Sequence, residues 1–389
     1  MENIWLTSAV WIGLALLASL ISIRIAVSVA LIEIVVGALA GNAFGLTSTE
    51  WVSYLAGAGA IVLTFLAGAE IDPVVVRRQF WPSVLIGLAG FLFPFLGVLA
   101  YTHYVISWPW QQALIAGISL STTSIAVVYA VMIETGFNRT EMGKVILAAC
   151  FVNDLGTVVA LGIFFANYNA WLALFGAITA IMMFLLPRFV PRFFKTVGNR
   201  ASEPEIKFIL LVLFLLGGLG TIAKSEAVLP AYLIGMILAP FFLKDKVLAG
   251  RMRTIIFTLF TPFYFIKAGA LVKGQTVLAA AGLIAVLLLT KMATKFVGIL
   301  PLTKNFRFGK REGMYTTLMM CTGLTFGTIS ALFGLTNKII DQDQYTILVT
   351  AVIASAVVPT LIAQKWFQPK HVPIEEEVNN NAQEDPARS

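Results

Sequence analysis

Long apolar runs separated by short polar connections occupy the chain from its first residues to about residue 365. A helix needs roughly 20 apolar residues to cross a hydrocarbon core of about 30 Å. The runs are continuous and about twice as long as the alternating segments of a transmembrane β-barrel. The pattern therefore predicts an all-α polytopic membrane protein with about 13 transmembrane helices, at 6–23, 25–41, 52–69, 82–103, 110–133, 144–166, 169–187, 206–223, 227–242, 254–271, 275–300, 312–335 and 344–365.

Composition supports this interpretation, since 59% of the 389 residues are hydrophobic and only 12% are charged. The first run lacks a basic leader and a small-residue cleavage site, so we expect a retained helix rather than a signal peptide. We expect residues 1–369 to form one membrane transporter region. The polar residues 370–389 are expected to form a disordered cytoplasmic tail.

The net charge of +7 comes from the connections between the runs, and we do not read it as a nucleic-acid signal. Of the 27 lysines and arginines, 21 fall on one side of the predicted membrane, three on the other and three within helices. The positive-inside rule then places the N-terminus outside and the C-terminus in the cytoplasm. The expected location is the cell (inner or plasma) membrane, as a multi-pass protein.

Two pairs of short motifs indicate an internal repeat. "FLAGAEI" (65–71) resembles "FIKAGALV" (265–272), and "IEIVVGALAG" (32–41) resembles "AYLIGMILAP" (231–240). The members of each pair lie seven predicted helices apart, so they cross the membrane in opposite directions. Inverted repeats of this kind are common in transporters. We predict that helices 1–6 and 8–13 are inverted halves, with the helix at 169–187 as their linker.

Two predicted helices have clusters of Ser, Thr and Gly, "SLSTTSIA" (119–126) and "TTLMMCTGLTFGTIS" (316–330), and the same offset of seven relates them. Interrupted helices at matching places in two halves are the best sequence pointer to a transport site. Close helix packing through small residues is the alternative. The residues expected at the breaks are Ser121, Thr122, Thr123, Ser124, Thr322, Gly323 and Thr325.

Asp154 lies near the middle of an apolar run, directly after Asn153. An ionisable residue inside a spanning helix is a functional candidate by default, because burying a charge there is costly. A carboxylate is also a hard oxygen ligand that suits a small metal cation such as Na⁺. One buried carboxylate can hold a proton or a cation, but not comfortably both, and an exchanger needs that competition. A buried Asp–Lys pair that only orders the helices is the alternative.

Other charges fall within or near the predicted helices. Lys291 is the expected charge partner of Asp154, whereas Lys295 is expected to extend toward the membrane surface. Glu33 is expected to have a structural or gating role. Glu70 is expected to be an interfacial charge, with gating as the other possibility. Cys150 and Cys321 have no disulfide or zinc spacing. No phosphate loop or HExxH motif is present, so neither an enzyme activity nor a cofactor is expected.

These residues together resemble the monovalent cation:proton antiporter superfamily, in particular its second branch of bacterial Na⁺/H⁺ antiporters and potassium-efflux exchangers. The similar stretches are "VALIEIVVGALAGNAFGL" (29–46), "FLAGAEID" (65–72), "LSTTSIAVV" (120–128), "ETGFNRTEMGKVILAACFVNDLGTVV" (134–159), "LPAYLIGMILA" (229–239), "TPFYFIKAGALV" (261–272) and "LLLTKMATKFVG" (287–298).

The resemblance implies a dimerisation domain, a six-helix core that moves as an elevator, and a homodimer. It implies that Asp154 carries the cation or proton, with Thr122 and Thr123 at one break, Thr322 and Thr325 near the other, and Lys291 as the membrane lysine. Electrogenic members carry two aspartates where this chain has Asn153 and Asp154. Electroneutral members resemble Asn-Asp but often carry Arg where this chain has Lys291. "CTGLTFG" replaces the family's basic motif, and the nucleotide-binding domain of the potassium-efflux branch is absent from this sequence.

The sequence therefore predicts an electroneutral 1:1 antiporter of Na⁺ (or Li⁺) and H⁺ in the lipid bilayer. K⁺/H⁺ exchange is the main alternative, because pocket geometry cannot be read from the sequence. A channel without proton coupling and a sensor without turnover are the alternatives from other classes.

Overall fold

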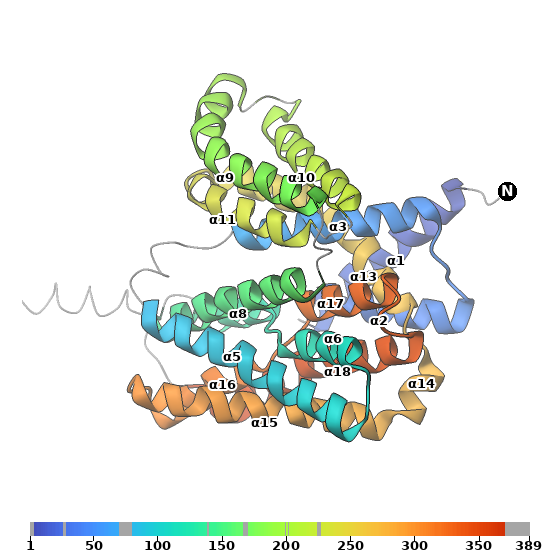
Figure 1. The fold of residues 1–389 in the computed structure, drawn as a ribbon, viewed down its shortest axis with the longest axis vertical. Coiled ribbons are helices and arrows are strands. Elements are labelled where there is room, and N and C mark those ends of the chain that lie inside the picture. Colours follow the sequence, from blue (N-terminus) through green and yellow to red (C-terminus); the bar gives the residue numbers. More distant parts are fainter. Residues whose placement is uncertain are drawn as a thin grey trace, which may run out of the picture. The chain divides into compact units, whose positions relative to one another are not determined.

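A computed structural model describes residues 4–25, 29–69, 80–137, 140–165, 170–198, 200, 202–223 and 227–369. Every regular element within these ranges is helical (Figure 1). Each of the thirteen predicted segments overlaps one described helix or a run of consecutive ones. Nine helices in the described part of the chain are long and apolar enough to cross a membrane, and two shorter apolar helices accompany them. The expectation of an all-helical membrane protein is confirmed.

The chain divides into two compact units, each assembled from segments distant in sequence. Unit 1 consists of residues 1–73, 157–281 and 332–347, and unit 2 consists of residues 74–156, 282–331 and 348–389. The helices of unit 1 are α1 (Ile4–Ile25), α2 (Val29–Phe44), α3 (Glu50–Ala69), α9 (Ala170–Val197), α10 (Pro204–Ile222), α11 (Val228–Lys244), α12 (Lys246–Ile255), η3 (Ile256–Phe260), α13 (Thr261–Ala270) and α14 (Gly274–Ala279).

Unit 2 contains α5 (Phe80–Ala100), the π-helical turn η1 (Tyr101–Val105), α6 (Trp110–Ser121), α7 (Ile125–Glu134), α15 (Ala281–Asn305), α16 (Lys310–Met320) and η4 (Ala363–Phe367), together with most of α8 (Glu141–Phe165), α17 (Thr325–Thr336) and α18 (Gln342–Ile362). A hydrophobic core that includes Ile146, Tyr315 and Met319 joins α8 to α16. The unit thus brings the segments around residues 120, 150 and 320 together.

Two close helix pairs in unit 1 depend on glycine. α2 packs on α13 and α3 packs on α11. A Cβ on Gly37 would overlap the Ile266 carbonyl, and one on Gly269 would overlap the Ile34 carbonyl. A side chain at any of these positions would therefore push the backbones apart.

The second pair repeats the arrangement of the first. A Cβ on Gly68 would overlap the Tyr232 carbonyl, and one on Gly235 would overlap the Phe65 carbonyl. In all four cases the contacted carbonyl lies three residues before the partner glycine. The two motif pairs found in the sequence therefore supply equivalent contacts.

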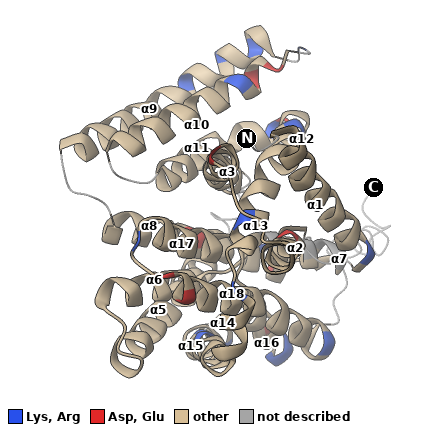
Figure 2. Ribbon diagram, turned by 90° about the vertical axis from the view of Figure 1, so that its right-hand side faces the viewer, with Lys and Arg blue, Asp and Glu red and all other residues tan. Residues whose placement is uncertain are grey.

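Two helical stretches extend beyond the prediction. α9 continues ten residues past the expected end at residue 187, through Pro187 and Pro191, to Val197. The unpredicted α12 is amphipathic, with Leu248 and Met252 buried between basic residues, which makes it too polar for a search based on spanning hydropathy. Lysine and arginine residues gather near the ends of helices such as α9, whereas most other residues along the helices are uncharged (Figure 2).

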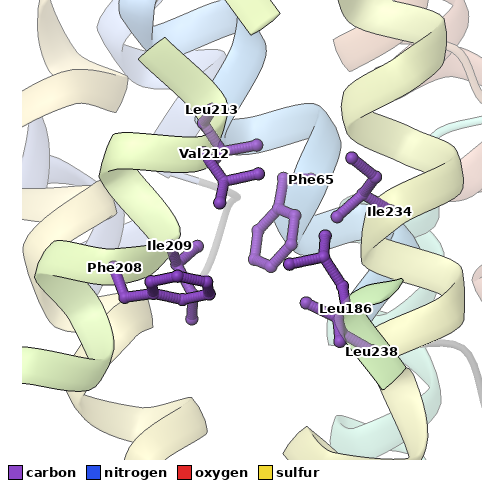
Figure 3. A pocket seen from close by; sticks show the side chains of 8 residues that line it. All are labelled: Phe65, Leu186, Phe208, Ile209, Val212, Leu213, Ile234 and Leu238. Atoms are coloured by element: carbon purple, nitrogen blue, oxygen red, sulfur yellow. The ribbon is translucent and has the colours of Figure 1, made fainter. Parts of the chain in front are cut away.

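An apolar pocket in unit 1 lies around Phe65, between α3, α9, α10 and α11 (Figure 3). All of its lining side chains are hydrocarbon. The pocket therefore offers no side-chain oxygen to a cation.

Candidate functional site

Asp154 is fully buried in the middle of α8, and Asn153 beside it is also fully buried. Neither carboxylate oxygen of Asp154 has a hydrogen-bond partner in the described part of the protein. Buried polar atoms in folded proteins nearly always have partners, and exceptions call for an explanation. A bound proton would neutralise the carboxylate, whereas a bound cation could take both oxygens as ligands.

Asn153 joins α8 to the interruption between α6 and α7. Its Oδ1 accepts a hydrogen bond from the Thr123 backbone N–H at 2.8 Å, and its Nδ2 donates to the Ser121 carbonyl at 3.3 Å. An ionised aspartate could accept the first bond but could not donate the second. The amide therefore fits both backbone groups of the break.

The two predicted interruptions are present, and their backbones contact each other. α6 ends at Ser121 and α7 begins at Ile125, while α16 ends at Met320 and α17 begins at Thr325. The Ser124 N–H donates to the Thr322 carbonyl at 3.0 Å, and the Thr123 hydroxyl donates to the Met320 carbonyl at 2.8 Å. The prediction of two broken helices is confirmed.

The hydroxyls near the breaks mostly bond within their own segment. Thr122 Oγ1 donates to the Ser119 carbonyl, Thr322 Oγ1 to Met319 and Ser121 Oγ to Ile118. Ser124 Oγ accepts from the Val127 N–H at 3.5 Å. Thr325 opens α17 and is buried. The three donated bonds occupy the hydroxyl hydrogens of Ser121, Thr122 and Thr322 and leave oxygen lone pairs, which are the ligand atoms that a hard cation needs.

Lys295 lies where the first halves of both broken helices end. Its Nζ donates to the Thr122 carbonyl at 3.1 Å, to the Thr123 hydroxyl at 2.8 Å and to the Met320 carbonyl. The last carbonyls of a helix lack partners within the helix, and a positive charge there is favourable. One ammonium group therefore satisfies acceptors from α6 and α16 together.

This placement corrects the expectation for Lys295, which does not extend to the membrane surface but is fully buried. Lys295 donates to the ends of both broken helices. Lys291 donates instead to Ser355 Oγ at 2.8 Å. No ion pair joins Lys291 to Asp154 in this structure, because both carboxylate oxygens are unpartnered.

Of the two predicted gating residues, one lies within the described part of the chain. Glu33 belongs to unit 1 and is 2% exposed, and its Oε2 has no partner among the described residues. Glu70 lies outside the described residues. Lys295 and Ser355 were missed as site residues. The spacing of four between Lys291 and Lys295 was the available signal for the first, whereas "VIASAVV" offers no signal for the second.

The described residues contain no group of three or more His, Cys, Asp or Glu side chains that could hold a resident metal ion. The candidate site instead has one buried carboxylate, in the same unit as the hydroxyl and carbonyl oxygens of the two breaks. Such a set suits a hard cation that binds and leaves as a substrate.

Comparisons with known proteins show which chains and folds this protein is similar to. The profile of the family described as "Sodium/hydrogen exchanger, transmembrane" matches residues 12–367. A relative from Methanocaldococcus jannaschii, named probable Na(+)/H(+) antiporter 3, is 22% identical over 82% of this chain and 85% of its own length. The Na(+)/H(+)-K(+) antiporter GerN of Bacillus cereus is 21% identical over 91% of this chain and 94% of its own.

A solved structure shows the same fold. The sodium proton antiporter MjNhaP1 of Methanocaldococcus jannaschii, determined at pH 8, has a TM-score of 0.72 at 15% identity. The match covers 95% of this chain and all of that chain. The described helices therefore follow a known membrane fold despite the low identity.

Proposed function

The chain belongs to the sodium/hydrogen exchanger family, and from that premise we propose that it is a secondary antiporter, not an enzyme, that exchanges Na⁺ for H⁺ through Asp154. The observation that carries the proposal is the fully buried carboxylate with two unpartnered oxygens. A proton or a cation can each compensate its charge. Exchange follows because occupancy by one excludes the other.

An electroneutral 1:1 exchange is the proposed stoichiometry. Asn153 is the immediate neighbour of Asp154 and bonds the backbone of the α6–α7 break. An amide cannot carry a second exchangeable proton in this pH range. With a single site carboxylate, each cycle returns one proton for one cation and moves no net charge.

Lys295 is the proposed fixed counter-charge, in place of Lys291. It is fully buried in the same unit as Asp154 and binds both broken helices. Thr122, Thr123, Thr322 and Thr325 are the proposed sources of further oxygen ligands for the cation.

Alternating access is proposed to come from an elevator movement of unit 2. Two observations support this proposal: the chain divides into two compact units, and all the proposed ion-site residues belong to unit 2. The repeated glycine contacts support inverted halves, with α9 as the linker. We also propose a homodimer, an N-terminus outside the cell and a cytoplasmic C-terminus. The predicted tail, 370–389, lies outside the described residues.

The test uses the purified full-length chain in proteoliposomes, with an internal dye that reports proton movement. Addition of Na⁺ or Li⁺ outside should drive protons out of vesicles that contain the wild-type protein. The Asp154→Asn variant should show no such proton efflux. Proton movement by Asp154→Asn against a Na⁺ gradient would reject the site assignment. Rates that depend on an imposed membrane potential would reject the 1:1 stoichiometry.

Exchange of K⁺ for H⁺ is the second candidate, and the name of the Bacillus cereus relative, which includes K⁺, favours testing it. The same vesicles with K⁺ in place of Na⁺ decide between the two cations. A cation current without proton movement would instead indicate a channel.

A further inference from the structure

Lys291 is a second fully buried lysine, one helical turn before Lys295 on α15. Residues four apart lie on the same face of a helix. Two lysines therefore point from α15 toward the broken helices, although a single ammonium already satisfies the ends of α6 and α16. The second lysine needs a separate explanation.

The surroundings of the two amino groups differ. Lys295 has three acceptors within hydrogen-bond distance, which matches the three N–H groups of an ammonium. Lys291 has one, the Ser355 hydroxyl of α18, at 2.8 Å. Ser355 Oγ also lies 2.8 Å from the Val352 carbonyl and 3.5 Å from the Gly323 carbonyl. The Lys291–Ser355 bond thus ties α15 to α18 beside Gly323.

Gly323 lies in the α16–α17 break, and the amino group of Lys291 fills the space where a side chain would be. A Cβ at Gly323 would overlap Lys291 Nζ and would lie 3.0 Å from Ser355 Oγ and 3.1 Å from Thr122 Oγ1. Glycine is therefore required for the break to approach this pair. The Lys291 amino group thus lies against the second interruption at Gly323, whereas Asp154 has no hydrogen bond to it.

We propose that Lys291, Ser355 and Gly323 form a support for the α16–α17 break, in which Lys291 is a positioning residue for the cation site and not the charge partner of Asp154. The support acts through Thr322, which precedes Gly323 and whose carbonyl accepts the Ser124 N–H of the other break at 3.0 Å. Displacement of Gly323 moves this carbonyl and weakens the cation site. The inference rests on the proposed cation exchange.

The experiment compares Ser355→Ala, Lys291→Met and the double variant with the wild-type protein in proteoliposomes, as initial rates over a range of Na⁺ concentrations. Loss of the hydrogen bond should raise KM for Na⁺ about tenfold and leave the maximal rate within about twofold. Because both changes remove the same interaction, the double variant should match the single variants rather than multiply their effects.

Ser330→Ala is the matched control, because Ser330 is also a buried serine of unit 2 and donates only to the carbonyl of its own helix at Phe326. It should keep the wild-type KM. Gly323→Ala should reduce the exchange rate. The double variant Gly323→Ala/Lys291→Ala should recover part of that rate, because the shorter side chain at position 291 leaves room for the added methyl group. Recovery of exchange by a second substitution requires a folded protein. It therefore distinguishes a positioning role of Lys291 from a general loss of stability.

Three results would overturn the proposed support of the α16–α17 break. They are an unchanged KM for Na⁺ in Ser355→Ala, multiplied effects on KM in the double variant, and no recovery of exchange in Gly323→Ala when Lys291→Ala is added. A change in coupling ratio or voltage response in Lys291→Met would also overturn it, because that result marks a residue that carries charge. Absence of exchange by the wild-type protein would instead reject the proposed function.

Discussion

At the scale of single residues, the proposed 1:1 stoichiometry depends on Asn153. It bonds two backbone groups of the α6–α7 break and stands directly before the proposed site carboxylate. We propose that its amide combines a structural role with a limit on the number of exchangeable protons. The limit can be tested by changing one functional group.

Asn153→Asp should make exchange respond to membrane potential, because a second carboxylate allows two protons to return for one cation. The variant should also be less stable by about 1–3 kcal/mol, since the Ser121 carbonyl loses a donor. The measurement is dye-reported proton flux under imposed potentials of both signs. Asn337→Asp, an exposed position with the same chemical change, should remain insensitive to voltage. Equal rates at all potentials in Asn153→Asp would contradict the role assigned to Asn153.

At the scale of elements, the two broken helices depend on Lys295, which donates to the carbonyls of Thr122 and Met320. Lys295→Met should abolish exchange and lower the free energy of unfolding by about 1–3 kcal/mol for each carbonyl left without a donor. Thermal unfolding in detergent and vesicle transport measure the two effects. Lys304→Met, at an exposed lysine of the same helix, should be near neutral in both. Wild-type stability in Lys295→Met would argue against this support of the breaks.

The glycine contacts of unit 1 give a second prediction at this scale. Gly235→Ala should destabilise the protein by about 1–3 kcal/mol, because the added methyl group overlaps the Phe65 carbonyl of α3. Gly176→Ala is the control, since a Cβ there meets nothing within 4 Å and alanine favours a helix. Unfolding temperatures in detergent compare the two variants. Equal stability would show that α3 and α11 tolerate a wider separation.

The sequence predicted the elements more successfully than their contacts, for physical reasons. Apolar run length determines where helices can span, so all thirteen segments were located. Ser, Thr and Gly within a run indicated both breaks. The bonds of Lys295 to Thr122 join residues 173 positions apart, and no local pattern encodes such a pair. Ser355 is likewise an ordinary small residue until α15 is placed beside it.

At the scale of the whole molecule, the distribution of lysine and arginine predicts which connections face the cytoplasm. The connection with Lys244, Lys246, Arg251 and Arg253 is strongly basic, whereas Lys273 is alone on its connection in the predicted outward-facing set. Basic connections remain in the cytoplasm during insertion. The two sides should therefore differ in their access to reagents that cannot cross the membrane.

Lys273→Cys should react with a membrane-impermeant maleimide on intact cells, whereas Lys246→Cys should react only after permeabilisation. Both positions are exposed in the structure, so reactivity reports the side of the membrane rather than burial. The parent protein is the control and should stay unlabelled, because Cys150 and Cys321 are fully buried. Labelling of Lys246→Cys on intact cells would invert the proposed orientation.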